Sequence, residues 1–220
     1  MELHIFDLDE TLIAGDSGVL WHQFLVQEGV VTQVGFLEQD AAMMQQYALG
    51  ELALEQYISF SLTPIKHLSS EQVDRLVSHF VRQQVNRIVY PQGQVLISQL
   101  KQSHEVLIIS ATVSFIVNQV AQLLGVEHHL GVDLYADQGK YTEQIQGVAS
   151  FREGKVTRLK QWLTDQSRQY SSISFYSDSI NDQPLLEYAD NAYTVNPCPK
   201  LKQLALERNW TQFSWQLQSY

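Results

Sequence analysis

The sequence predicts an α/β protein: a Rossmann-like parallel sheet covered by helices on both faces, with an all-helical insertion after the first strand. From residue 91 onward, short apolar runs alternate with segments of helical periodicity, which is typical of a parallel sheet. Between residues 15 and 90 only helical periodicity occurs. We therefore expect a core formed by residues 1–14 and 91–220 and a helical cap formed by residues 15–90.

The stretch from residue 3 to residue 13 combines the pattern of a buried strand with paired carboxylates. An apolar run over residues 3–6 predicts a strand, and Asp7 and Asp9 follow at its expected end. Because side chains alternate along extended backbone, both carboxylates face the same way. Two like charges held so close raise the pKa of one carboxyl unless a cation intervenes.

This stretch has three interpretations. An Asp-rich turn in which Asp9 or Thr11 caps a helix is the plain one. A calcium loop counted from Asp7 would need glycine and glutamate where Leu12 and Gly18 stand, so we reject it. The third is a phosphoryl-transfer site with an aspartate nucleophile.

The remaining elements follow from periodicity and from breaking residues. In the insertion we expect helices beginning near Val19, over 36–49, over 52–61 and from Ser69 or Ser70 onward. Beyond Pro91 we expect helices over 94–102, 113–124, after Gly154 and over 200–207, strands over 105–109, 172–176 and 191–195, and a hairpin of 130–135 with 141–145.

Polar clusters follow three of the predicted strands, at the edge where open α/β sheets bind ligands. They are Asp7 with Asp9, Ser110 with Thr112, and Asp178 with Asn181 and Asp182. Carboxylates suit Mg²⁺, and a hydroxyl beside free N–H groups at a helix start suits a phosphate. Each cluster alone is equally consistent with a turn or a helix cap. Their joint occurrence favours phosphoryl transfer.

Lys155 is expected in the first turn of a helix, where a cation opposes the helix dipole. Glu153 partly offsets this cost. The competing lysines have plainer positions, because Lys140 falls in the expected hairpin turn and Lys160 on a solvated helix face. Lys155 is therefore the candidate cation of the site.

Composition limits the classes of partner. The 220 residues carry a net charge of −10, which argues against nucleic acid or an anionic membrane as the main partner. A lone cysteine, Cys198, excludes an intrachain disulfide, and acidic residues interrupt any apolar segment at the start of the chain. We expect a soluble, cytoplasmic protein that is a monomer or a homodimer.

Taken together and in order, these motifs resemble those of the haloacid dehalogenase (HAD) superfamily. The matching residues are Asp7-Leu-Asp9-Glu-Thr11, Ser110, Lys155 and the stretch from Asp178 to Asp182. The insertion resembles the C1-type cap of subfamily IB, the phosphoserine phosphatase-like enzymes. The segment Gly15-Asp16-Ser17 at its start and Gly154-Lys155-Val156 in the core strengthen this resemblance.

The resemblance implies a Mg²⁺-dependent phosphatase with an aspartyl-phosphate intermediate. Asp7 would attack phosphorus, Asp9 would act as general acid and then as general base, and Thr11 would position the loop. Ser110, Ala111 and Lys155 would bind the phosphoryl group. Asp7, the backbone carbonyl of Asp9 and Asp178 would hold Mg²⁺, while Asn181 and Asp182 would orient metal waters and Lys155.

The resemblance leaves the substrate open among small phosphorylated metabolites. Asp16 matches an acidic residue that contacts the substrate amine in phosphoserine phosphatases. Phosphoserine and histidinol phosphate rank nearly level. Cap cations that could meet a substrate carboxylate are equally consistent with solvated helix charges: Lys66, Arg75, Arg82 and Arg87. Alternatives of another class are a receiver-like domain and a non-catalytic phosphate-binding module.

Overall fold

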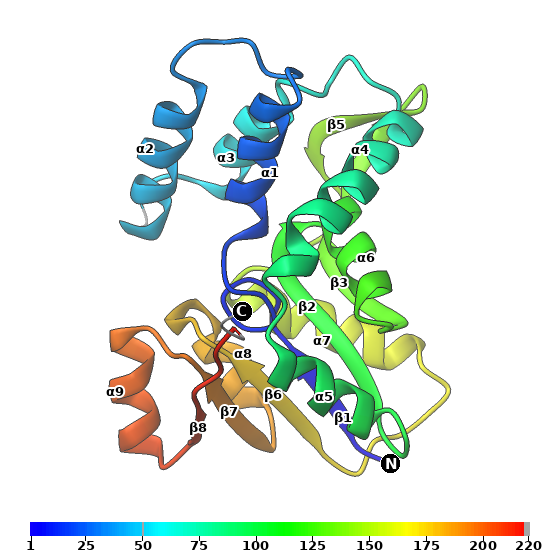
Figure 1. The fold of residues 1–220 in the computed structure, drawn as a ribbon. Helices are drawn as coiled ribbons and strands as arrows, with labels where there is room; N and C mark the ends of the chain where they lie inside the picture. The colour runs from blue at the N-terminus through cyan, green and yellow to red at the C-terminus, as the bar shows by residue number, and fades with distance from the viewer. Residues whose placement is uncertain (50, 218–220) are drawn as a thin grey trace.

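The core is a six-stranded parallel sheet in a computed structural model that describes residues 1–49 and 51–217 (Figure 1). The strands stand in the order β3-β2-β1-β6-β7-β8, and every neighbouring pair is parallel. Their bounds are β1 Leu3–Phe6, β2 Glu105–Val113, β3 His128–Val132, β6 Ile173–Ser177, β7 Asn191–Val195 and β8 Thr211–Phe213. The predicted fold class is confirmed, although the sequence pattern does not predict the short strand β8.

Helices cover both faces of this sheet. Leu3 and Ile5 of β1 pack in a core with α7 (Glu153–Asp165), α8 (Gln183–Tyr188) and α9 (Pro199–Arg208). Phe6 belongs to a second core, which includes α5 (Pro91–Leu100) and α6 (Ser114–Leu123). Because β1 is central and covered on both faces, all four of its residues are buried.

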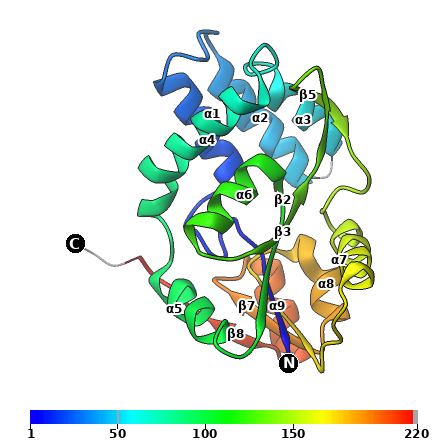
Figure 2. The same ribbon diagram turned by 90° about the vertical axis from the view of Figure 1, so that its right-hand side faces the viewer.

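Four helices form a layer at the carboxyl end of the strands, as both ribbon views show (Figures 1 and 2). They are α1 Ser17–Gln27, α2 Phe36–Leu49, α3 Leu54–Leu62 and α4 Ser70–Gln83. Ser69 caps α4 as expected: its side chain accepts a hydrogen bond from the Gln72 amide at 3.3 Å. The cap helices share an apolar core that includes Trp21, Phe24 and Phe80.

The predicted hairpin lies further along the chain than expected. Its strands are β4 (Leu134–Asp137) and β5 (Lys140–Ile145), whereas residues 130–132 belong to β3 of the main sheet. The first arm was wrong because an apolar run does not reveal which strand it pairs with. The hairpin reaches the cap, where Ser59 donates a hydrogen bond to Glu143 at 2.8 Å (Figure 1).

Strand order places the polar clusters together. From β1 the chain runs outward to β3 and later returns to the other side for β6 to β8. The carboxyl end of β1 is therefore the topological switch point, where ligands of open α/β sheets bind. Among the residues described, no helix is long and apolar enough to cross a membrane.

Candidate active site

Asp7 and Lys155 form the buried centre of the site. Asp7 follows β1 and is 7% exposed, while Lys155 stands in the first turn of α7 and is 2% exposed. The Lys155 Nζ lies 2.8 Å from Asp7 Oδ1 and 2.8 Å from Asp182 Oδ2. Two carboxylates thus compensate a cation that the helix dipole alone would disfavour.

Burial sets the protonation of this centre. It raises the pKa of Asp7 well above its ordinary value; the charge of Lys155 opposes that rise, and Asp182 and Asp178 add to it. Burial alone would lower the pKa of Lys155, but Asp182 and Asp7 raise it above the ordinary value, so the ammonium stays charged. The carboxylates outnumber the cation here, and the site favours a further positive charge.

Asp178 directly follows β6, and Thr11 holds it in place. The Thr11 hydroxyl donates a hydrogen bond to Asp178 Oδ1 at 3.1 Å and accepts one from the Asp178 amide at 3.0 Å. Burial and the nearby Asp182 raise the pKa of Asp178 to about 7. Ser177 donates to Asp182 Oδ2 at 2.7 Å, which fixes the carboxylate that contacts Lys155. Sequence reasoning did not single out Ser177.

Three donors hold the carboxylate of Asp9. The Ser17 amide donates to Oδ1 at 2.6 Å, while the hydroxyls of Thr112 and Ser110 donate to Oδ2 at 2.8 and 3.2 Å. The Ser110 hydroxyl is therefore engaged with Asp9 in this structure. Neither hydroxyl caps α6, whose N-cap is Val113. Thr112, which lies on the cavity wall, and the fully buried Ser17 therefore position the carboxylate of Asp9.

A cavity of about 220 Å³ joins the core clusters to the cap. The predicted residues on its wall are Asp7, Asp9, Asp16, Ser110, Ala111, Lys155, Asp178, Asn181 and Asp182. Thr11 lies behind this wall, where it is fully buried. Asn181 accepts a hydrogen bond from Arg152 Nε at 3.2 Å. The sequence-predicted residues thus converge on one space.

The cap contributes acidic and aromatic groups to the cavity. Asp16 caps α1 by accepting a hydrogen bond from the Val19 amide at 2.9 Å. Burial and the neighbouring Asp9 raise the pKa of Asp16 to about 7. Burial and the carboxylates of Asp40 and Asp16 raise the pKa of Tyr57, which donates a hydrogen bond to Asp40 at 3.0 Å.

A buried histidine–aspartate pair joins two cap helices beside the cavity. His22 Nδ1 of α1 lies 2.9 Å from Asp40 Oδ1 of α2, and both side chains are at most 3% exposed. His22 also lines the cavity. No local motif marks this pair, because its two members are brought together only by the packing of the cap helices.

Cap cations do not reach the cavity. The four candidates Lys66, Arg75, Arg82 and Arg87 are exposed, and none belongs to the cavity wall. Among the described residues that line it, Lys155 is the only lysine or arginine. We therefore assign the cap cations to solvated helix and loop surfaces.

The cavity lies at the switch point of the sheet, beneath an inserted cap, and it contains paired carboxylates and a buried lysine. These features define a phosphoryl-transfer enzyme of the HAD type. The chain belongs to the haloacid dehalogenase-like hydrolase family, whose model matches residues 5–187. It is a HAD-type phosphatase, a phosphoric monoester hydrolase. Membership in a hydrolase family, together with relatives named as phosphatases, favours an enzyme over the receiver-like and non-catalytic alternatives.

Two relatives of similar sequence are named as phosphatases. A histidinol-phosphatase of Neisseria meningitidis is 34% identical over 213 residues, which cover 94% of this chain and 96% of the relative. A phosphoserine phosphatase of Mycobacterium tuberculosis is 25% identical, covering 93% of this chain and 68% of its own length.

Solved structures agree with the fold. A protein of unknown function from Bordetella pertussis superposes with a TM-score of 0.90 at 32% identity, covering 96% of this chain and 97% of that one. A substrate-bound phosphoserine phosphatase superposes with a TM-score of 0.66 at 19% identity, covering 92% and 89%. The second likeness supports the fold alone.

Proposed function

We propose that this phosphatase is Mg²⁺-dependent and hydrolyses a small phosphate ester through a phosphorylated Asp7. The observation that carries the proposal is the shared cavity: Asp7, Asp9, Lys155 and Asp178 come from distant segments and line one space. Nucleophilic catalysis of this kind needs a carboxylate beside a cation and a second carboxyl that can carry a proton.

Asp7 and Asp9 have different roles in the reaction. Asp7 Oδ forms a bond to phosphorus as the bond from phosphorus to the alcohol oxygen breaks, and Asp9 donates its proton to that oxygen. Asp9 then takes a proton from water, whose oxygen attacks phosphorus and frees Asp7. Lys155, 2.8 Å from Asp7, reduces the repulsion between the nucleophile and the phosphoryl oxygens.

The residues present suit Mg²⁺. Burial first, and then neighbouring carboxylates, raise the pKa values of Asp7 and Asp178. A cation would stabilise the charged form of both groups, and all the donors are oxygen atoms. Asp7, the backbone carbonyl of Asp9 and Asp178 would hold the ion, with Asn181 beside them. When bound, Mg²⁺ supplies positive charge that stabilises the phosphoryl group in the transition state.

The cap favours a substrate with an amine and without a carboxylate. Asp16 and the neighbouring Asp40 supply carboxyl groups on the cap side, where the described wall carries no lysine or arginine. A phosphorylated amino acid would leave its carboxylate unpaired near Asp16 and Asp9, at a large desolvation cost. We therefore rank a phosphorylated amino alcohol, such as histidinol phosphate, above phosphoserine.

A matched substrate panel tests this function. Histidinol phosphate, phosphoserine, phosphoethanolamine and glycerol phosphate are assayed with Mg²⁺ and with a chelator, using Asp7→Asn as the inactive control. We expect kcat/KM to be highest for histidinol phosphate, with no turnover in the chelator. Activity that survives chelation or Asp7→Asn would contradict the mechanism.

The amine contact has a separate test in Asp16. Asn keeps the α1 cap and removes the charge, so Asp16→Asn isolates electrostatics from helix capping. We expect it to lower kcat/KM for both amine-bearing alcohol phosphates while sparing glycerol phosphate. Equal losses on all of these esters would remove Asp16 from substrate recognition.

A further inference from the structure

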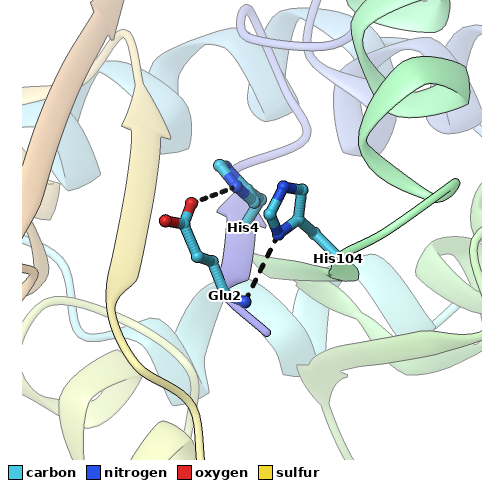
Figure 3. Close-up of side chains that lie close together, drawn as sticks. All are labelled: Glu2, His4 and His104. Atoms are coloured by element: carbon cyan, nitrogen blue, oxygen red, sulfur yellow. Dashed lines mark hydrogen bonds and ion pairs between the residues drawn. The ribbon is translucent and has the colours of Figure 1, made fainter.

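Three side chains of kinds that can ligate a metal meet at the amino ends of β1 and β2, the opposite end of the strands from the cavity. Glu2 precedes β1, His4 belongs to it, and His104 precedes β2 (Figure 3). Glu2 and His4 are two residues apart in extended backbone, so they share a face. The parallel register pairs Leu3 with Glu105, which brings His104 beside Glu2 on that face.

The spacing of the three groups suits one ion. One ligand atom from each residue lies within 4.8 Å of the other two. His4 Nε2 and Glu2 Oε2 are 3.3 Å apart. Two ligands of a tetrahedral Zn²⁺ with bonds of about 2.0–2.1 Å stand about 3.3–3.4 Å apart. The His4–Glu2 separation therefore already matches a shared metal.

The surroundings of His4 indicate that its ring can take a further ligand. Its side chain is 8% exposed, and its buried Nε2 makes no well-aligned hydrogen bond to any residue the structure describes. The contact of Nε2 with the Glu2 carboxylate, at 3.3 Å, is an ion pair only when the ring is protonated. Nδ1 lies 3.4 Å from the Tyr176 hydroxyl, which can accept its proton and leave the lone pair of Nε2 facing Glu2. A cation between them would replace this repulsion with attraction.

Burial, and then the neighbouring His104, lower the pKa of His4, whereas the charge of Glu2 and its hydrogen bond to the ring raise it. A lowered pKa favours the neutral imidazole, which is the form that ligates a metal. The rings of His4 and His104 stand edge to face with centroids 5.2 Å apart (Figure 3). Glu2 is 42% exposed on its side chain and opens the cluster to solvent.

His104 must change one contact. Its Nδ1 accepts a hydrogen bond from the Glu2 amide at 3.3 Å, so the proton of the neutral ring stands on Nε2. Ligation of a metal through Nε2 would therefore require the proton to move to Nδ1 and the hydrogen bond from the Glu2 amide to break.

We propose that Glu2, His4 and His104 form a binding site for Zn²⁺ or a related first-row transition-metal ion. Two imidazoles and one carboxylate are a ligand set that Zn²⁺ accepts and Mg²⁺, which prefers oxygen, does not. The ion would link the residues around the start of β1 to the residue before β2. Because the site lies across the sheet from Asp7, it stabilises the fold and takes no part in turnover.

Zinc titration of the tag-free, chelator-stripped protein tests this site, with excess Mg²⁺ present to fill the catalytic carboxylates. We expect one Zn²⁺ per chain and, at 100-fold excess over Kd, a rise of roughly 5–10 °C in the unfolding midpoint. His104→Gln and Glu2→Gln should each weaken binding at least about tenfold. Both substituted side chains are partly exposed, so the two variants leave the buried His4 unchanged.

Two controls locate the ion. His67→Gln removes an exposed cap histidine, and His128→Gln removes a nearby histidine that already pairs with Glu105 at 2.6 Å. Both should bind Zn²⁺ as the wild type does. Co²⁺ should give the strong visible absorption of tetrahedral nitrogen ligation in the wild type and lose it in His104→Gln. Absent zinc binding, or binding unchanged by both cluster variants, would overturn the proposal.

Discussion

Replacing Lys155 with methionine removes an ammonium group that lies 2.8 Å from both Asp7 and Asp182. Removing one partner of a buried ion pair costs about 3–5 kcal/mol, because the remaining charges stay buried without compensation. For a chain of this size each kcal/mol lowers the unfolding midpoint by about 2–4 °C. We therefore expect Lys155→Met to unfold roughly 6–20 °C below the wild type in Mg²⁺-free buffer at pH 8.

The pH dependence of the unfolding midpoint tests whether charge repulsion causes the loss of stability in Lys155→Met. In the variant, Asp7 and Asp182 repel each other until one takes a proton, so the gap to the wild type should narrow as the pH falls to 5. Lys160→Met is the control, because Lys160 lies exposed on the same helix, with its Nζ 5.0 Å from the Tyr188 ring centre. Thermal unfolding of all three proteins measures the effect. A loss in Lys155→Met no larger than in Lys160→Met would refute the reasoning.

Three other variants test the electrostatics and packing of the site. Asp16 has a pKa of about 7 in the folded chain, against a reference value of 3.8. As the pH rises from 4 to 7, the wild type should therefore lose stability relative to Asp16→Asn, by at most about 4 kcal/mol. Denaturant unfolding at each pH measures this difference in the free energy of unfolding. Asp178→Ala should raise the Mg²⁺ concentration for half-maximal activity at least about tenfold, and an unchanged metal titration would count against Asp178 as ligand. Gly154→Ala would press a Cβ into the Ala149 carbonyl oxygen and displace the first turn of α7, so both the unfolding midpoint and kcat should fall; a variant with wild-type values would show that this turn adapts.

The part of the site that local sequence encodes was predictable. Asp7, Asp9 and Asp178 follow apolar strands, and the edge of a parallel sheet collects such residues whatever the loop lengths. Lys155 stood out because a cation in a first helical turn needs compensation, and the structure places two carboxylates against it.

Contacts that depend on packing were not predictable. Which hydroxyls hold Asp9 depends on how β2 sits beside the loop after β1, and the pair of His22 with Asp40 depends on how two cap helices cross. The hairpin was misplaced for a similar reason: residues 130–132 read equally well as a hairpin arm or as a parallel strand. Such choices are settled by partners far apart in the chain.

Chemical trapping tests the phosphorylated intermediate most directly. The enzyme is quenched during turnover of histidinol phosphate and treated with borohydride, which reduces an acyl phosphate on aspartate to homoserine. We predict homoserine at position 7 in the wild type and none in Asp7→Asn. Turnover that leaves position 7 as aspartate, or homoserine found at position 9, would contradict Asp7 as the nucleophile.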